Sequence, residues 1–343
     1  MSEQLINKSS HLLPDLGETS ASQYRFFPSL LQPAHVVASM TDLDELVELA
    51  AQLRSPEIRG FAEDEARDLL ARFQTAYQPQ MVNYQENCIW FRAVKCSAEG
   101  FQSLHRCIYL PSGSPNLGRA NLKNRPVLYA AWNVNTALEE VRAETGDYVQ
   151  LIGFNVQPGR LARCVNLGDI QRRQNSGRSL FDDPSGDIRI NNMVKHNPQK
   201  YQLCLYIDTV LAELFRRQSD VPADHFLTAT VADAFHRGNI SVLYPSVRTM
   251  HALNIAIPGC VFDDTFQVLL AEVHHINRNF GDGIHLTTRL KQSTTFAKDG
   301  TIDWSEWMSL NTRIGKYGAL EPAPGTVGWR VQRPPSSDRR PSA

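Results

Sequence analysis

The chain has 343 residues, of which 42% are hydrophobic and 21% are charged, and its formal net charge is −1. A chain of this length can bury one large or two modest hydrophobic cores, and its composition excludes a fibrous or wholly disordered protein. Because the charges nearly balance, the chain as a whole is not expected to attract nucleic acid or an anionic membrane, so any phosphate binding must be local.

The N-terminal residues lack a signal-peptide pattern, and no stretch approaches the roughly 20 apolar residues of a membrane span, so we expect a cytoplasmic protein without membrane contact. The six cysteines are scattered without a Cys-x-x-Cys pair, and the histidines lack a metal-binding spacing with a carboxylate. The sequence therefore predicts no metal site.

Composition and the spacing of apolar residues divide the chain into four segments. Residues 1–24 are polar and aperiodic, which predicts a flexible arm. Residues 25–84 are expected to form a helical extension, because apolar residues recur there at helical spacing in two stretches. Strands and helices alternate over residues 85–290, the expected main domain. Residues 291–343 are expected to form a C-terminal extension with a flexible tail rich in Pro and Gly.

A short aromatic and β-branched segment over residues 89–94 predicts a strand that carries Arg92 between apolar neighbours. Alternation sends the Arg92 side chain to the face opposite those neighbours, where solvent is the favoured destination and a polar cleft is the alternative. The long loop over residues 111–126 contains Arg119 and Arg125, which could reach an anionic ligand. The glycine-rich fingerprints of the common dinucleotide and P-loop folds are missing.

This loop leads into a strand followed by a helix. Residues 127–131 form an apolar run of strand length, and a periodic apolar stretch from Asn135 onward predicts a helix. Glu139 and Glu140 would then lie in the first turn of that helix, about 100° apart, so that one can face solvent while the other looks back towards Tyr129. Carboxylates in a first turn also complement the helix dipole, so a purely structural role stays open.

The second half of the chain alternates between further strands and helices. Strands are expected over residues 148–156, 240–248, 253–261 and within 266–290, and helices over 201–215 and 225–235. The polar insert over residues 168–198 is either a lid or a surface excursion. Pro245 cannot donate to a strand ladder, so its strand is an edge strand or ends there, and Ser246 emerges into a turn or cleft. Without a Gly-x-Ser-x-Gly elbow, Ser246 is interpreted as a hydrogen bonder and not as a nucleophile.

Together these motifs resemble the RES family, a toxin domain often paired with an Xre-type antitoxin and named for an Arg, a Glu and a Ser. The segment around Arg92 is similar to the opening arginine of the family. The segment from Arg119 into the Tyr129 strand is similar to its second arginine and its tyrosine strand. The helix start aligns Glu140 with the family glutamate, with Glu139 as the fallback.

The last matching motif is Tyr244-Pro245-Ser246, which resembles the segment that carries the family serine. The resemblance covers about residues 88–262. It implies an ADP-ribosyltransferase-like α+β fold, with a split mixed β-sheet and flanking helices, to which the N-terminal helical extension is added. Residues 85–290 would be the NAD-binding catalytic domain.

The activity that the resemblance implies is cleavage of the nicotinamide–ribose bond of NAD+ by hydrolysis or phosphorolysis, in a toxin of a toxin–antitoxin system. Transfer of ADP-ribose to a protein and a catalytically silent NAD-binding module are the alternatives. NAD+ would be the substrate, with no metal. The implied protein partner is an Xre-type antitoxin, and a homo-oligomer is left open.

The residues that the resemblance assigns to NAD binding are Arg92, Arg119, Asn121, Tyr129, Glu140, Tyr244 and Ser246. Glu140, Arg92 and Ser246 are the catalytic candidates among them. Glu140 would stabilise the oxocarbenium-like state of the ribose, as a carboxylate does in glycoside hydrolysis. The two arginines would bind the pyrophosphate and Tyr129 would stack on the nicotinamide. Ser246 would hydrogen-bond the ribose or orient Glu140.

Overall fold

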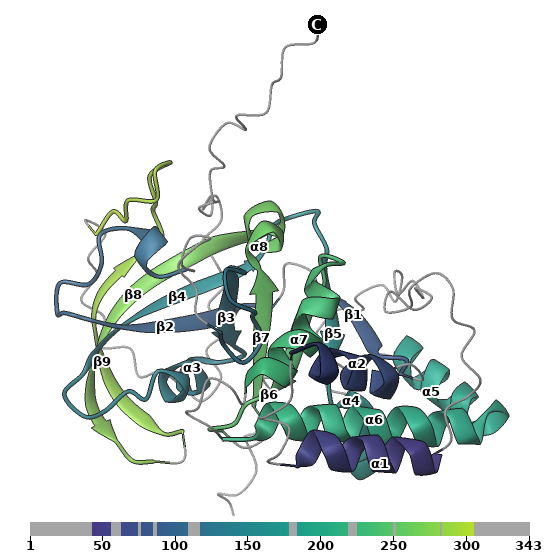
Figure 1. Ribbon diagram of the computed structural model, residues 1–343. Coiled ribbons are helices and arrows are strands. Elements are labelled where there is room, and N and C mark those ends of the chain that lie inside the picture. Colours follow the sequence, from purple (N-terminus) through teal and green to yellow (C-terminus); the bar gives the residue numbers. More distant parts are fainter. Residues whose placement is uncertain are drawn as a thin grey trace, which may run out of the picture.

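The structure, a computed structural model, describes residues 43–55, 63–74, 77–84, 88–108, 117–177, 184–218, 225–249, 252–281 and 283–304 (Figure 1). The expected arm over residues 1–24, the tail beyond residue 304 and much of the loop before residue 117 lie outside these residues. None of the helices within the described ranges is long and apolar enough to cross a lipid bilayer.

The described residues form one mixed sheet with the strand order β1-β5-β6-β7-β3-β2-β4-β8-β9. The strands are β1 (Gln80–Tyr84), β2 (Trp90–Cys96), β3 (Val127–Ala131), β4 (Tyr148–Val156), β5 (Ala162–Asn166), β6 (Ser241–Pro245), β7 (Leu253–Pro258), β8 (Phe266–Asn279) and β9 (His285–Ser293). Neighbouring strands are antiparallel except β5 and β6, which are parallel. The expected α+β fold with a mixed sheet is therefore confirmed.

The sheet splits between β3 and β2. Each of these strands is paired along its whole length with its other neighbour, β3 with β7 and β2 with β4. Between β3 and β2 themselves, Phe91 with Ala131 is the pair that the described residues form. We therefore divide the sheet into a helical half (β1, β5, β6, β7 and β3) and a strand half (β2, β4, β8 and β9).

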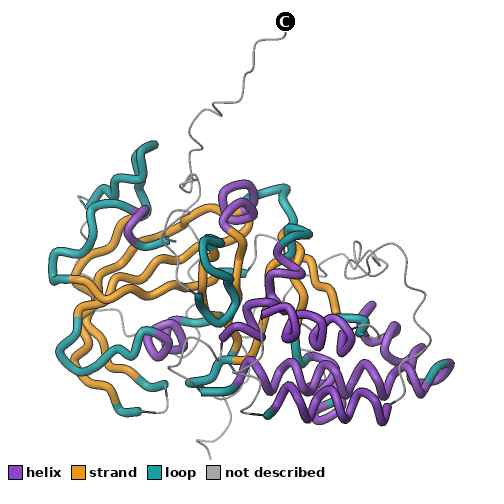
Figure 2. Tube along the Cα trace, viewed as in Figure 1, coloured by secondary structure: helices purple, strands orange, loops and turns teal. Residues whose placement is uncertain are grey.

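Helices cover the two halves unequally (Figure 2). They are α1 (Leu43–Arg54), α2 (Glu63–Gln74), α3 (Val134–Glu140), α4 (Asp169–Ser176), α5 (Pro184–His196), α6 (Pro198–Arg216), α7 (Phe226–His236) and α8 (Gly259–Thr265). The buried faces of α1, α2, α6 and α7 form one apolar core with β5, β6 and β7. The short α3 packs instead on β2 and β4 of the strand half.

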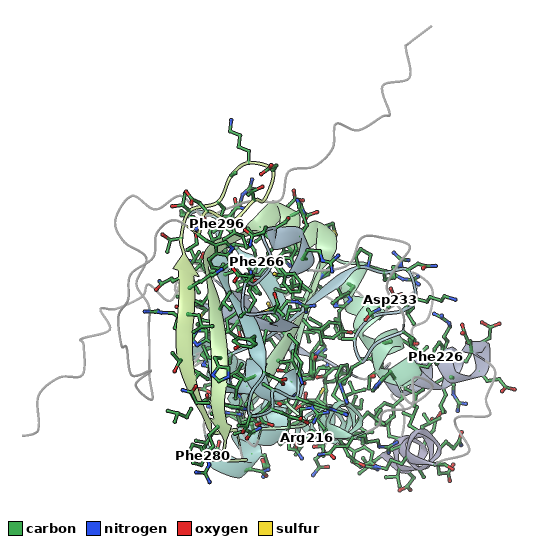
Figure 3. The ribbon with its side chains drawn as sticks, turned by 90° about the vertical axis from the view of Figure 1, so that its left-hand side faces the viewer. Arg216, Phe226, Asp233, Phe266, Phe280 and Phe296 are labelled. Carbon is green, nitrogen blue, oxygen red and sulfur yellow. The ribbon has the colours of Figure 1, made fainter. Side chains whose placement is uncertain are left out.

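The opposite face of the sheet carries a continuous core. Apolar residues of both halves, such as Leu128, Phe154 and Ile255, belong to one cluster that extends beneath the split, together with α8 and the 3-10 turn Leu104–Arg106. Figure 3 shows Phe266 and Phe296 beside the strands and Phe226 among the helices. On the face that carries α3 and the long helices, the core is interrupted where the sheet splits.

Several local predictions need correction. The insert over residues 168–198 is largely helical, in α4 and α5, and packs against α6. The expected helical extension also contains a strand, because β1 pairs with β5 at the sheet edge. Strand β5 and helix α8 were not predicted, since each is short and lacks a clear period. The strands predicted over residues 127–131 and 148–156 have those bounds in the structure.

Candidate functional site

A cavity of about 250 Å³ opens where the sheet splits. Its apolar lining comes from Phe91, Ala93, Ala130, Ala131, Ala137 and Val141, and its polar lining from Arg92, Arg119, Tyr129, Glu140, Tyr244 and Asn254. The lining therefore combines β2 and α3 with β3, β6 and β7 (Figure 1). Four of the six apolar residues are alanines, so the space that the strands leave at the split is not filled by side chains.

Glu140 reaches this cavity because α3 is short. Asn133 begins the helix by accepting a hydrogen bond from the backbone N–H of Thr136 (2.8 Å), and the helix ends seven residues later at Glu140. Glu140 therefore lies in the last turn and not in the expected first turn. The helix dipole does not favour a carboxylate at this end, so the structural explanation of an acidic residue here loses its physical basis.

Two neutral groups hold the Glu140 carboxylate. Its Oε1 accepts hydrogen bonds from Ser246 Oγ and from Asn254 Nδ2, each at 2.7 Å. Its Oε2 has no hydrogen-bond partner among the described residues, and no described cation forms an ion pair with Glu140. The residue is exposed, as expected for a group at a cavity mouth.

The Ser246 side chain hydrogen-bonds to Glu140 but is not part of the cavity lining. Strand β6 ends at Pro245 as predicted, although it is an inner strand, and the chain then turns. The Ser246 hydroxyl accepts hydrogen bonds from the backbone N–H groups of Arg248 and Thr249, both at 3.2 Å. With its oxygen engaged in this way, the hydroxyl donates its hydrogen to Glu140. Of the two expected roles, the geometry matches orientation of the carboxylate.

Glu139 lies elsewhere. Its Oε1 is 3.3 Å from Nε2 of His285 at the start of β9, and Glu139 is not part of the cavity lining. The His285 side chain is fully buried, and burial lowers the pKa of its imidazole below the usual value although Glu139 acts in the opposite direction. Of the two candidate carboxylates, the cavity contains Glu140.

Arg92 bridges the split and does not extend into solvent as favoured from the sequence. Its Nε donates to the carbonyl oxygen of Cys107 (2.8 Å), and its Nη1 donates to the carbonyl oxygen of Tyr129 on β3 (2.9 Å). Burial lowers the pKa of the guanidinium, which still stays charged at neutral pH. The guanidinium thus supplies a cross-strand hydrogen bond where the main chains of β2 and β3 diverge.

Arg119 is anchored to the end of α6. Its Nη1 donates to the carbonyl oxygens of Phe215 (2.6 Å) and Arg217 (2.9 Å), which satisfies backbone acceptors at that helix terminus. These two bonds use both hydrogens of Nη1. The Nε and Nη2 side of the guanidinium, a complete two-donor fork, makes no hydrogen bond to the described residues and is available to a ligand.

Tyr129 is fixed by the loop before β3. Its hydroxyl donates to Asn121 Oδ1 (2.7 Å) and accepts from the backbone N–H of Ala120 (2.8 Å). Asn121, which the family resemblance assigns to NAD binding, is buried, is not part of the cavity lining and holds the Tyr129 hydroxyl. A side chain at Gly118 would collide with Asn121 Oδ1 and approach the Tyr129 hydroxyl, which explains the glycine.

Tyr244 completes the aromatic part of the site. Its ring packs at 5.0 Å, centroid to centroid, on Phe215 of α6. Burial raises the pKa of both Tyr244 and Tyr129 above the usual tyrosine value, so both remain neutral phenols at physiological pH. The two rings offer flat surfaces and no charge.

Asn254 is the polar cavity residue that sequence reasoning missed. It lies on β7 and contacts Glu140 directly. A signal was present, because Asn254 is the polar residue in the otherwise apolar run Leu253–Pro258. Nothing local connects it to Glu140, which lies 114 residues earlier in the chain.

The arrangement suits an anionic ligand with a flat ring and a centre that becomes positively charged. Arg119 provides a fork for phosphate, the tyrosines provide ring faces, and Glu140 provides a negative charge that no described cation neutralises. Within the described ranges, no group of three or more His, Cys, Asp or Glu side chains could hold a metal ion.

The sequence profile of the RES domain matches residues 89–275, more than half of the chain. The matched stretch begins at β2 and ends within β8, so it contains all the cavity-lining residues and Ser246. It leaves out α1, α2, β1 and β9. Neither a curated protein nor a solved structure matches the chain.

Proposed function

Because the chain belongs to the RES domain family, we propose that it is an enzyme that consumes NAD+ by breaking the bond between nicotinamide and ribose. One observation carries the proposal: Glu140 enters the cavity as a carboxylate held by two neutral donors, beside Arg119 and Tyr129. A carboxylate placed only for stability would be expected to pair with a cation or to lie at a helix N-terminus.

The charge of Glu140 suits this chemistry. Cleavage of a nicotinamide–ribose bond passes through a state with positive charge on the ribose, and a nearby carboxylate stabilises that charge. A cation paired with Glu140 would cancel much of the effect, and none of the described residues supplies one. The carboxylate oxygen Oε2 is left for the ribose, because Ser246 and Asn254 both bind Oε1.

The remaining cavity residues support binding of a dinucleotide. We propose that the open fork of Arg119 binds the pyrophosphate bidentately and that Tyr129 and Tyr244 contact the nicotinamide and its ribose. The cavity of about 250 Å³ is smaller than the roughly 300–1,000 Å³ of typical ligand pockets. We therefore expect it to hold the nicotinamide–ribose half, with the adenosine half across its mouth.

The test is to incubate the purified full-length protein with NAD+, with and without phosphate, and to follow nicotinamide and the ribose products by NMR. Nicotinamide with ADP-ribose indicates hydrolysis, and a phosphorylated product that forms only with phosphate indicates phosphorolysis. Protein that retains label from adenine-labelled NAD+ indicates ADP-ribose transfer. Unchanged NAD+ under all three conditions would contradict an NAD-consuming enzyme and favour a silent binding module.

We also propose that the activity makes the protein a toxin that an Xre-type antitoxin restrains in the cytoplasm. The support for this proposal is membership of the RES domain family. Expression of the wild-type chain should lower cellular NAD and arrest growth, and co-expression of the antitoxin should restore both. Growth arrest that persists in Glu140→Gln would contradict a toxin that acts through NAD.

A further inference from the structure

Asn254 lines the cavity, although neither a sequence motif nor the family resemblance described above gives it a role. It lies on β7 opposite Ala131 of β3, and only 4% of it is exposed. Its Nδ2 donates to Glu140 Oε1 at 2.7 Å. Its Oδ1 is buried without a hydrogen-bond partner.

An asparagine is an unfavourable residue for this position in purely structural terms. Strands buried on both faces are near-continuous apolar runs, and the other residues of β7 are all apolar. A buried amide is destabilising unless both of its ends are paired, and here one end is left unpaired. The hydrogen bond from Asn254 Nδ2 to Glu140 is therefore made although it leaves Oδ1 buried and unpaired.

The Asn254 donor completes a specific arrangement around Glu140. Ser246 and Asn254 approach the same carboxylate oxygen, from the turn after β6 and from β7. Both belong to the helical half of the sheet, whereas α3 packs on the strand half. Two bonds to Oε1 restrict rotation of the carboxylate and leave Oε2 without a donor among the residues that the structure describes. Because both donors are neutral, the carboxylate keeps its full charge.

We propose that Asn254 is a positioning residue that fixes the ionised Glu140 carboxylate through Oε1 and leaves Oε2 for the substrate; its catalytic consequence rests on the proposed NAD cleavage. The orientation of the amide depends on the charge of Glu140. An ionised carboxylate requires the NH2 end, and a protonated one would itself donate and favour the buried Oδ1.

The first experiment compares Asn254→Asp with the wild-type enzyme. The substitution keeps the shape, and the new carboxyl can donate to Glu140 only while it is protonated. At acidic pH the variant should approach the wild-type kcat. As the pH rises, kcat should fall by about ten- to a hundred-fold, a range expected for a misplaced catalytic group, with KM for NAD+ changed by less than about three-fold.

The matched control is Asn155→Asp. Asn155 is also a buried strand asparagine, on β4, and accepts a hydrogen bond from Gln267 away from the cavity. This variant should show the wild-type kcat and its pH profile. If Asn254→Asp has the same pH profile as the wild type, or if kcat falls equally at every pH together with the folded fraction, Asn254 has no positioning role.

A second measurement reads the contact without turnover and does not require Asn254→Asp to fold. In protein labelled with ¹⁵N-asparagine, the side-chain amide signals of Asn254 should move in Glu140→Ala, which removes the acceptor oxygen. They should move much less in Glu140→Gln, which keeps an acceptor oxygen at the same place. Equal shifts in the two variants would overturn the proposal.

The two proposals fail in different ways. If the wild type leaves NAD+ intact while the Asn254 amide signals still respond to loss of the Glu140 acceptor, NAD cleavage is contradicted and the positioning contact is supported. If the wild type cleaves NAD+ while the Asn254 amide signals do not respond to that loss, the proposed function is supported and the positioning role is overturned.

Discussion

The two halves of the sheet are stabilised differently. The helical half buries one face beneath a layer of helices that includes α1, α2, α6 and α7, whereas the strand half carries only the seven-residue α3 on the same face of its described part. Sequence periodicity predicts the long helices, but it does not predict which residues lie where the two halves of the sheet meet. The border is nevertheless where the cavity and its charged groups lie.

Polar side chains replace main-chain pairing at this border. Glu140 of α3 is held by Ser246 and Asn254 of the helical half, and Arg92 of β2 donates to the Tyr129 carbonyl oxygen of β3. The site therefore has two kinds of residue. Arg92 joins the halves and lines the cavity, so its loss affects stability and binding together. Glu140 carries a charge that can be removed while its hydrogen bonds are kept.

The largest effect is expected for Glu140→Gln. The amide oxygen can still accept from Ser246 and Asn254, so the free energy of unfolding should change by no more than about 1 kcal/mol. Loss of the negative charge should lower kcat for nicotinamide release by about a hundred- to a thousand-fold. The control is Glu139→Gln, which removes the carboxylate next to His285 outside the cavity and should keep wild-type turnover. Equal losses in both variants would exclude a specific role for Glu140.

Arg92→Ala should break the link between the halves. It leaves the carbonyl oxygens of Cys107 and Tyr129 without their charged donor, so we expect a loss of about 3 kcal/mol in the free energy of unfolding, measured with urea. Arg119→Ala is the comparison, because the hydrogen bonds of Arg119 to Phe215 and Arg217 stay within the helical half. That variant should lose NAD affinity with a smaller loss of stability. If Arg119→Ala is the less stable protein, Arg92 does not join the halves.

A pH titration should distinguish the buried carboxylates of the two halves. In the helical half, Asp208 accepts hydrogen bonds from Tyr77 and from the backbone of Gly168 and Gln171, yet burial raises its pKa to about 6. Folding therefore favours its protonated form. This contribution is complete below about pH 4 and is lost as the pH rises through 6, which amounts to about 3 kcal/mol.

In the strand half, Glu272 has the opposite shift. Burial acts to raise its pKa, but hydrogen bonds and charge from His274 and Arg289 lower it overall. Its contribution is present above the unfolded pKa of about 4.3 and is lost as the pH falls. Relative to Asp208→Asn, the wild type should lose stability from pH 4 to pH 7. Relative to Glu272→Gln, it should lose stability on acidification. The same sign of pH dependence in both comparisons would contradict these assignments.

The smallest effect is expected for Gly118→Ala. The added methyl group would displace Asn121 from the Tyr129 hydroxyl, and overpacking of this kind destabilises by about 1–3 kcal/mol. Because Tyr129 lines the cavity, KM for NAD+ should rise more than kcat falls. Gly259→Ala controls for the loss of a glycine, because its backbone is not in the left-handed region and the added methyl group would meet Pro126 at an ordinary contact distance of 3.4 Å. An unchanged KM in Gly118→Ala would show that the position of Tyr129 does not affect binding.

Much of the fold could be predicted where the signal is local. Apolar runs located β3 and β4, and the missing N–H of Pro245 located the end of β6. The motifs around Arg92, Glu140 and Ser246 indicated the family, which the profile match confirms. Local signals failed for the insert at residues 168–198, because its helices α4 and α5 are polar and are stabilised by packing on α6.

The site could be predicted only as a set of residue types. Ser246 and Glu140 are 106 residues apart, and their hydrogen bond depends on β6, β7 and β3 being neighbours. Sequence periodicity says which face of an element is apolar, but not which element lies beside it. For that reason strand alternation alone favoured solvent over a polar cleft for Arg92, which only the family resemblance assigned to the site, and Asn254 was not recognised.

The sequence by itself determined the helices and strands whose pattern repeats within a few residues, the end of β6 and the family. Those features follow from side-chain periodicity and from proline chemistry, which act over short stretches of chain. Only the tertiary structure decided that β2 and β3 part after one pair, that Glu140 and not Glu139 enters the resulting cavity, and that Asn254 holds it. These depend on contacts between distant segments, which form only when both halves of the sheet have closed around a common core.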